Sequence, residues 1–293
     1  MADIRQSAAY ARYIAKLGWK VLQILNPPAG WAGPKPQINV FVRKLWIFGA
    51  IAKIQRVNFS LPWKKINKIL KENRVWMCKI EPINITSFNP PLNLRGGNPK
   101  GEGDILREHH FFLDNWPMLA TKTLRVDLTP TKEKILGQFK KDCRYILKKY
   151  SVFSIQYSVN KFEMFYKIWK KSAKRKSLWI PPVKDYLSLL KSFDKNCFCI
   201  TIDDQAGAVI LVHDSVAYYY YAGATGEGTK QNLPYLIVWK AMQEAKKRKC
   251  KIWDFEGIYD ERWPNKGWKG FSHFKKSFGG YEVEFPGSFT KWF

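Results

Sequence analysis

The two halves of this sequence predict the same succession of secondary-structure elements. In each half, the spacing of apolar residues predicts helices, then a series of short strands, then another helix and a closing strand. The similarity lies in the order of the elements and not in the residues. Because a sheet must bury its apolar face under helices, we expect two related α/β domains with mixed sheets.

In the first half, apolar residues at helical spacing predict a short helix over 8–17, with Ser7 as its N-cap and Gly18 at its end. Residues 83–122 are rich in Pro, Gly and Asn and show no sustained period, so we expect them to wrap a surface or to contain elements that the pattern does not reveal. The other elements predicted in this half are strands at 19–25, 38–54 and 75–80 and a helix at about 62–72.

In the second half, the segment 125–130 predicts a strand that leads into a helix over 131–149, with Thr129 as N-cap and Pro130 in the first turn. The pattern also predicts strands at 152–158, 197–203, 206–213, 216–222 and 250–255, and helices near 160–174, 183–193 and 234–249. Cys197 and Cys199 alternate within an apolar run, which favours packing in a strand over metal binding.

The chain is strongly basic. It contains 50 Lys and Arg against 24 Asp and Glu, which gives a formal net charge of +26. Such a surface attracts polyanions at long range, so nucleic acid, anionic lipid and phosphorylated substrates are candidate partners. A lysine-rich codon usage accounts for part of this excess, but not for the basic runs at 170–176 and 246–251.

Several classes of protein are disfavoured. Five cysteines without CxxC spacing indicate a reduced, cytosolic protein, and Asp3 and Arg5 lie where a signal peptide needs an apolar core. The longest apolar stretch, 45–52, is too short to span a bilayer, so we expect any membrane contact to be at the surface. The four histidines lack metal-site spacing and no GxSxG motif occurs, which disfavours hydrolysis by a metal or a triad.

Three segments carry side chains that are candidates for a binding or catalytic site. Arg144 lies on the basic outward face of its helix, which is either a solvated face or a phosphate grip. Strand alternation places Tyr219 and Tyr221 on one face, either in packing or along a cleft, before a glycine-rich turn that is a weak phosphate-cradle signal. Asp254 ends a strand and is either a site carboxylate or the partner of a neighbouring lysine.

The stretch FSHFKKSFGG, residues 271–280, places two lysines between phenylalanines and closes with a glycine pair. Lys275 and Lys276 are, from composition alone, two more lysines of a basic chain. Gly279 and Gly280 permit a sharp turn into a last strand.

Seven pieces of the sequence, in their order and spacing, carry a resemblance to a known family. They are QSAAYARYIAKLGWKV (6–21), MCKIEP (77–82), TLRVDLT (123–129), KKDCRYILKKY (140–150), YYYYAGAT (218–225), LPYLIVWKAMQEAKKRKCKIWDFEGI (233–258) and GFSHFKKSFGGYEVEFPGSF (270–289). They resemble the FemABX family, the peptidoglycan-bridge aminoacyltransferases that take an amino acid from aminoacyl-tRNA to a cell-wall precursor.

The resemblance implies two tandem GNAT-like acyltransferase domains with a cleft between them. It places the first domain at 1–123 and the second at 124–280, with the tail 281–293 packing on the first. The sequence lacks a spare charged heptad segment, so it resembles the compact type without the helical arm of some relatives.

The resemblance also implies how the transfer is catalysed. A neutral amine attacks an ester carbonyl, and negative charge builds on the carbonyl oxygen. Lys275 matches the cation that the family places at this oxygen, where it also holds the tRNA terminus, and Phe274 is expected to orient it. In an extended segment Lys276 would point the other way and contact a tRNA backbone phosphate.

Further residues match precursor contacts of the family. Relatives often carry tyrosine near position 148, lysine near 12 and aspartate near 81, so this chain departs from the pattern there. The implied set is Arg144 and Lys148 as a diphosphate grip, Tyr219 or Tyr221 and Arg12 as precursor contacts, Glu81 in the first domain's cleft or in an ion pair, and Asp254 at the cleft floor.

Two other functions stay open. One is a GNAT-fold N-acyltransferase that uses acetyl-CoA, although the turn GATGEGTKQNLP (223–234) lacks the upstream basic residue of a pyrophosphate site. The other is a non-catalytic RNA-binding protein, which leaves the Phe-Lys pair unexplained. We expect no cofactor and no metal, aminoacyl-tRNA as donor, a UDP-linked or lipid-linked peptidoglycan precursor as acceptor, and a cytoplasmic monomer with peripheral contact at the inner face of the plasma membrane.

Overall fold

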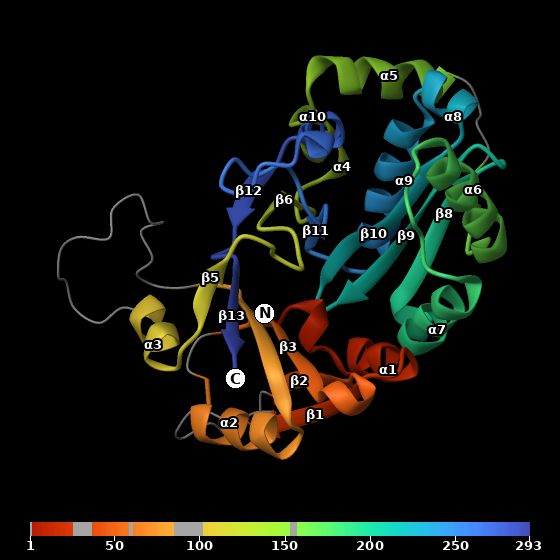
Figure 1. Ribbon diagram of the computed structural model, residues 1–293. Coiled ribbons are helices and arrows are strands. Elements are labelled where there is room, and N and C mark those ends of the chain that lie inside the picture. The colour runs from red at the N-terminus through yellow and green to blue at the C-terminus, as the bar shows by residue number, and fades with distance from the viewer. Residues whose placement is uncertain (1, 26–36, 59–60, 85–101, 153–156) are drawn as a thin grey trace. The chain divides into compact units, whose positions relative to one another are not determined.

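The computed structural model describes residues 2–25, 37–58, 61–84, 102–152 and 157–293 (Figure 1). The chain divides into two compact units. The first consists of Met1–Thr121 with Glu284–Phe293, and the second of Lys122–Val283. Among the described residues, no helix combines the length and the apolar character that crossing a membrane requires.

The first unit is built on a mixed six-stranded sheet in the order β1-β2-β3-β4-β13-β5. Its strands are β1 (Lys20–Leu25), β2 (Gln37–Lys44), β3 (Ala50–Val57), β4 (Val75–Pro82), β5 (Phe112–Asp114) and β13 (Ser288–Trp292). Its helices are α1 (Ala8–Lys16), α2 (Trp63–Glu72) and α3 (Glu102–Glu108). Strands β3 and β4 are parallel, and α2 connects them. The other paired neighbours run antiparallel.

The apolar spacing of the sequence explains this unit's core. Ile66 and Leu70 are one helical turn apart on α2 and are both fully buried. They share a cluster with residues of the central strands, such as Ile54 and Ile80. Ser7 caps α1 as predicted, because its side chain accepts a hydrogen bond from the Tyr10 amide.

The second unit is built on a seven-stranded sheet in the order β12-β6-β11-β10-β9-β8-β7. Its strands are β6 (Lys122–Asp127), β7 (Ser158–Val159), β8 (Cys197–Ile202), β9 (Ala206–His213), β10 (Val216–Ala224), β11 (Ile252–Asp254) and β12 (Tyr281–Glu284). Its helices are α4 (Lys132–Gly137), α5 (Lys141–Val152), α6 (Phe162–Arg175), α7 (Val183–Phe193), α8 (Gly226–Lys230), α9 (Leu233–Lys247) and α10 (Lys269–Lys276). Part of the strand predicted at 152–158 lies outside the described residues.

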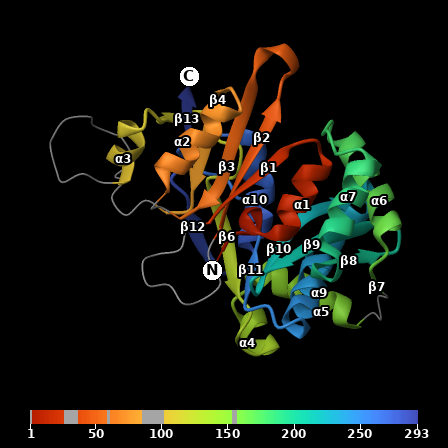
Figure 2. The same cartoon turned by 90° about the horizontal axis from the view of Figure 1, so that it is seen from below.

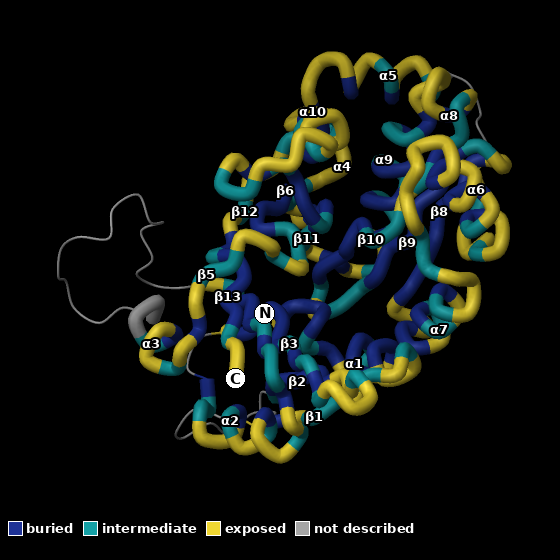
Figure 3. The backbone as a smooth tube through the Cα atoms, in the orientation of Figure 1, coloured by how far each residue is buried: buried dark blue, intermediate teal, exposed yellow. Residues whose placement is uncertain are grey.

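Helices cover both faces of this second sheet. Ala208 and Ile210 of β9 belong to the core that includes α9 residues, whereas a Cβ built on Gly207 would lie 3.0 Å from Phe165 of α6. Figure 3 shows β8 and β9 buried along most of their length. The two cysteines of β8 pack in this core as predicted.

The predicted repeat of elements is confirmed. In each unit three antiparallel strands precede a helix and a strand that is parallel to the third: β1-β2-β3-α2-β4 and β8-β9-β10-α9-β11. Each parallel pair is thus joined by a helical connection, as a parallel connection requires. The mixed α/β fold class follows from this arrangement.

The single helix predicted over 131–149 is wrong, because the structure has two helices there. The Lys140 amide donates to the carbonyl of Ser277 at 2.8 Å, so it is not used within a helix. Arg144 donates from Nη1 to the carbonyls of Gly137 and Phe139 and so supplies partners at the break. The N-cap is Thr131 rather than Thr129, whose amide and hydroxyl are instead bound by Asp127.

The predicted common face of Tyr219 and Tyr221 is also wrong. The pairing of β9 with β10 passes from Tyr219 opposite Ile210 to Tyr221 opposite Val209, so Tyr220 forms a β-bulge. Tyr219 is buried in the core of the second unit, whereas the ring of Tyr221 lies 4.1 Å from that of Trp169 on α6. One inserted residue places the two side chains on different faces.

Candidate functional site

The second unit contains a cavity of about 500 Å³ whose lining includes aromatic side chains and two lysines, Lys176 and Lys275. It lies where strand β10, the start of α9 and helix α10 meet. Tyr219 and Tyr220 come from β10, Tyr235 from α9, and Phe271, Phe274 and Lys275 from α10. Of the residues proposed from the sequence, the cavity therefore brings together Tyr219, Phe274 and Lys275.

Lys275 is held by two main-chain carbonyls at the end of β11. Its Nζ donates to Phe255 O at 2.7 Å and to Gly257 O at 2.6 Å. An ammonium has three N–H donors, so these bonds leave one for an acceptor in the cavity. The side chain is half-buried, and Lys275 lies in the last turn of α10, where the helix dipole favours a cation.

Burial changes the proton affinity of this amine. It lowers the pKa of Lys275 to about 8, and the negative charges of Glu256 and Asp254 partly oppose that effect. The cation is therefore the main form at neutral pH, and its population falls as the pH rises through about 8.

Asp254 shapes the backbone that holds Lys275. It is buried, accepts hydrogen bonds from Thr123 Oγ1 at 2.7 Å and the Glu256 amide at 2.8 Å, and pairs with Arg125 Nε at 2.8 Å. The Gly257 amide in turn donates to Thr123 Oγ1 at 3.1 Å. The carboxylate fixes the turn that presents the carbonyls to Lys275.

Lys275 and Lys276 belong to helix α10, so they do not lie in an extended segment. Successive helical residues differ by about 100° in direction, so the two amines still diverge. Lys276 pairs with Glu282 at 2.6 Å and is partly exposed. Gly279 and Gly280 adopt positive φ as expected, and a Cβ on Gly280 would lie 2.1 Å from Arg125 O.

The helix also changes which ring contacts Lys275. The ring centroid of Phe271, four residues earlier, lies 4.9 Å from Lys275 Nζ. Phe274 packs edge-on against Tyr235 at 4.9 Å and against Phe278 at 5.4 Å. Sequence reasoning missed Phe271 and Tyr235; the i to i+4 spacing of Phe271 and Lys275 would have indicated the first, had the segment been interpreted as a helix.

Residues 199–292, which include this cavity's strand β10 and helices α9 and α10, match the model of the FemAB family. This segment of the chain is similar to the FemAB family. The resemblance inferred from the sequence is thereby confirmed. A comparison with curated protein sequences found no match.

Solved structures resemble this chain at low identity. The crystal structure of FemX has a TM-score of 0.78 and 13% identity, covering 99% of this chain and 92% of that chain. The C-terminal domain of a putative lysylphosphatidylglycerol synthetase from Agrobacterium fabrum has a TM-score of 0.57 and 10% identity, covering 98% and 88%. A tandem GNAT protein from the clavulanic acid biosynthesis pathway has a TM-score of 0.51 and 9% identity, covering 92% and 85%.

These likenesses confirm the predicted fold of two tandem GNAT-like units. The match of residues 199–292 to the FemAB family model and this fold together support a transferase. The glycine-rich turn that follows β10 does not offer a free amide at Gly228, because that amide donates to Thr225 Oγ1 at 3.0 Å. A Cβ on Gly228 would lie 2.5 Å from Gln205 O, so this glycine serves close packing.

The other proposed residues of the second unit lie on its surface. Arg144 and Lys148 are exposed one turn apart on α5, and Arg144 uses Nη1 to bind the carbonyls at the end of α4. Neither residue lines the cavity that contains Lys275.

The two residues proposed in the first unit differ in exposure. Arg12 is exposed on α1. Glu81 is fully buried in β4, where Oε1 accepts hydrogen bonds from the amides of Met118 and Leu119 at 2.8 and 2.9 Å. Gln55 donates to its other oxygen at 3.3 Å. Glu81 thus binds the backbone of the segment that contains Met118 and Leu119.

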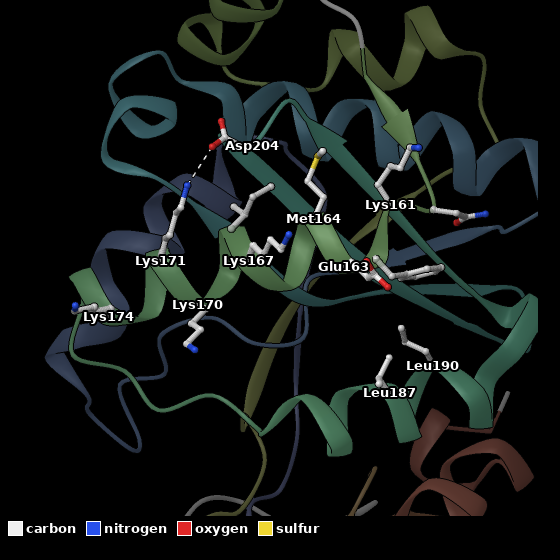
Figure 4. Close-up of a pocket in the computed structure, with 13 residues that line it drawn as sticks. Lys161, Glu163, Met164, Lys167, Lys170, Lys171, Lys174, Leu187, Leu190 and Asp204 are labelled. Atoms are coloured by element: carbon white, nitrogen blue, oxygen red, sulfur yellow. Dashed lines mark hydrogen bonds and ion pairs between the residues drawn. The ribbon is translucent and has the colours of Figure 1, made fainter.

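A second cavity, of about 1050 Å³, lies between α6 and α7 and is rimmed by lysines (Figure 4). Lys167, Lys170, Lys171 and Lys174 are spaced along one face of α6, and Leu187 and Leu190 of α7 face that helix. Lys171 pairs with Asp204 at 3.1 Å. Lys170, Lys171 and Lys174 belong to the basic run at 170–176 noted in the sequence.

Proposed function

We propose that this chain is an aminoacyltransferase that moves an amino acid from aminoacyl-tRNA to an amine of the stem peptide of a peptidoglycan precursor. The observation that carries the proposal is Lys275, a cation held at the wall of an aromatic cavity within the segment that matches the FemAB family. A cation in a largely apolar pocket interacts more strongly with developing charge than one in water.

The reaction makes one bond and breaks another. The neutral amine of the acceptor attacks the ester carbonyl carbon of the donor, the C–N bond forms, and the ester C–O bond to the ribose breaks. The leaving ribose oxygen takes the proton that the amine loses, so no cofactor is needed. The third N–H of Lys275 stabilises the oxyanion, an effect worth about 3 kcal/mol for one well-placed donor.

The surrounding residues fit supporting tasks. Phe271 and Phe274 exclude water from the cavity, and Asp254 keeps the carbonyls of the β11 turn in place. Burial raises the pKa of Tyr219, so its hydroxyl stays protonated and is a donor for the precursor. Arg144 and Lys148 on α5 suit the precursor diphosphate, because a guanidinium binds such oxygens in a bidentate manner.

The lysines of α6 suit the RNA of the donor. Four cations on one helical face match a phosphate backbone, and neutralising phosphates by lysine releases counterions. Lys276 is a further candidate for a backbone phosphate, although an RNA phosphate would have to replace its ion pair with Glu282. We expect transfer to weaken as the salt concentration rises.

The test is a reconstituted reaction. The purified protein is incubated with a pool of charged tRNAs and, separately, with the UDP-linked and the lipid-linked precursor, and the products are weighed. A mass gain of one amino-acid residue identifies donor and acceptor together. The absence of any gain with every combination, from protein that is folded by circular dichroism, would overturn the proposal.

Two control reactions address the alternatives. Acetyl-CoA in place of charged tRNA tests for an acetyltransferase, and we expect no acetylated product. Tight binding of uncharged RNA without any transfer would instead indicate a non-catalytic RNA-binding protein.

A further inference from the structure

The turn between β2 and β3 exposes three consecutive large apolar side chains. Trp46, Ile47 and Phe48 are 89%, 75% and 73% exposed. Single exposed apolar residues are normal on protein surfaces, but a contiguous group marks a surface that meets a partner. The sequence already shows this group as its longest apolar stretch.

The backbone holds this turn in a defined shape. The Leu45 amide donates to Gly49 O at 2.8 Å, and the Phe48 amide donates to Leu45 O at 2.9 Å. Trp46 and Gly49 both have positive φ, and a Cβ on Gly49 would lie 2.8 Å from Arg74 O. The turn is therefore packed against the start of β4, and its three side chains face outward.

Further aromatic residues lie at the same end of the first unit's sheet. Trp292 and Phe293, at the end of β13, are 65% and 57% exposed. The rings of Trp76 and Trp292 lie 5.4 Å apart, and the Phe293 amide donates to Trp76 O at 2.9 Å. Trp76 also lies beside Gly49 of the turn. In Figure 2 the turn that connects β2 and β3 and the C-terminus lie at the same end of this unit.

Cations surround these apolar residues. Arg43 and Lys44 end β2, Arg74 precedes β4, and Lys20 begins β1; all four are exposed. Lys20 donates to Asn73 Oδ1 at 2.8 Å, which places it beside the end of α2. The acidic Glu72 at that helix end lies 3.8 Å from Lys68. The charge around the turn is thus mainly positive.

We propose that this end of the first unit docks on the surface of an anionic lipid bilayer. The docking turn Trp46–Phe48 would enter the boundary between headgroups and acyl chains, where tryptophan and phenylalanine side chains are favoured. Arg43, Lys44 and Arg74 would lie at the level of the lipid phosphates. An anionic bilayer fits this arrangement, because its negative phosphates surround the place where the apolar side chains would enter.

The test uses sedimentation with vesicles of phosphatidylcholine alone or mixed with phosphatidylglycerol. We expect the protein to bind the mixed vesicles, to bind more weakly as salt is added, and to bind phosphatidylcholine alone poorly. The variant Trp46→Ser/Ile47→Ser/Phe48→Ser should bind the mixed vesicles at least about tenfold more weakly, since each buried CH₂ contributes to membrane affinity. Arg43→Gln/Lys44→Gln should lose about fivefold per charge.

A matched control removes exposed apolar side chains elsewhere. Leu178 and Trp179, in the second unit, are 61% and 80% exposed, and Leu178→Ser/Trp179→Ser should bind vesicles as the unchanged protein does. Equal loss in both variants, or unchanged binding by the turn variant, would overturn the proposal. So would a change in oligomeric state of the turn variant in analytical ultracentrifugation, which would assign the turn to a second copy of the chain.

This inference does not depend on the proposed function. Transfer between soluble substrates, measured without vesicles, should be unchanged in the turn variant. Loss of docking with transfer intact, or the reverse, therefore separates the two proposals.

Discussion

Each unit buries a carboxylate near the end of the strand that follows its connecting helix. In the first unit this is Glu81 of β4, and in the second it is Asp254 of β11. Both accept main-chain amides: Glu81 from Met118 and Leu119, and Asp254 from Glu256. In both, the carboxylate fixes a segment that leaves the sheet.

The difference lies in what the fixed segment then does. In the second unit it presents carbonyls to Lys275, which α10 brings to a cavity. In the first unit a partly buried cation near the carboxylate is Lys53, whose pKa burial lowers to about 8 while Glu81 opposes that effect. The comparison teaches that a buried carboxylate at the strand end is a structural feature shared by both units. In the second unit, the segment that it fixes also holds Lys275 at a cavity.

The largest expected effect separates two adjacent lysines. Lys275→Met should lower kcat/KM for transfer about 10²–10³-fold, because it removes the charge at the oxyanion. Lys276→Met should lower kcat/KM less than about tenfold, since Lys276 forms a surface ion pair with Glu282. Product mass against time measures both, and circular dichroism checks the fold. Equal losses of kcat/KM in the two variants would contradict the proposal that Lys275 stabilises the oxyanion.

Substitution of the two buried carboxylates should destabilise the protein to different extents. Asp254→Asn leaves the Arg125 guanidinium without its counter-charge and should lower the free energy of unfolding by about 3 kcal/mol. Glu81→Gln keeps an oxygen for the amides of Met118 and Leu119 and should cost about 1 kcal/mol. Urea denaturation followed by fluorescence provides both values. A larger cost for Glu81→Gln would show that the two carboxylates do not play the roles described.

The pH dependence of transfer should distinguish Lys275 from Lys53. The pKa of each is lowered to about 8, and Lys275 must be protonated to stabilise an oxyanion, so the rate should fall as the pH rises through about 8. Lys53→Met should retain this alkaline limb. The residual activity of Lys275→Arg should lack it, because arginine stays protonated. An alkaline limb that disappears in Lys53→Met would assign the titration to the first unit.

The smallest expected effect concerns the two rings of α10. Phe271→Leu removes the ring beside the Lys275 ammonium and should reduce kcat a few-fold, since a partly buried cation–π contact contributes about 1 kcal/mol. Phe274→Leu should mainly lower the melting temperature, because its ring packs on Tyr235 and Phe278. Steady-state kinetics and thermal unfolding of both variants test this division. The reverse pattern would favour Phe274 as the residue that orients Lys275.

Local rules predicted the features that depend on neighbours in sequence. Ser7 caps α1 because an N-cap needs only the next turn of its own helix. Gly279 and Gly280 adopt the positive φ that glycine permits. The order of elements in both units followed from apolar spacing, which reports on one element at a time.

The errors occurred where distant residues intervene. The helix predicted over 131–149 is interrupted where the Lys140 amide bonds to Ser277, a residue far along the chain. The bulge at Tyr220 depends on how β10 pairs with β9. Neither the Lys140–Ser277 hydrogen bond nor the bulge leaves a periodic signal in the sequence, so the sequence could not predict either feature.

The sequence by itself determined the mixed α/β fold class, and it suggested the family resemblance and singled out Lys275, because these depend on periodicity and on motifs in order. Only the tertiary structure decided that Phe255 and Gly257 hold the Lys275 amine, that Phe271 lies beside it, and that Trp46–Phe48 face outward beside Trp76 and Trp292. The reason is physical: a hydrogen bond or a ring contact requires atoms to meet, and residues distant in sequence meet only once the strands and helices have packed.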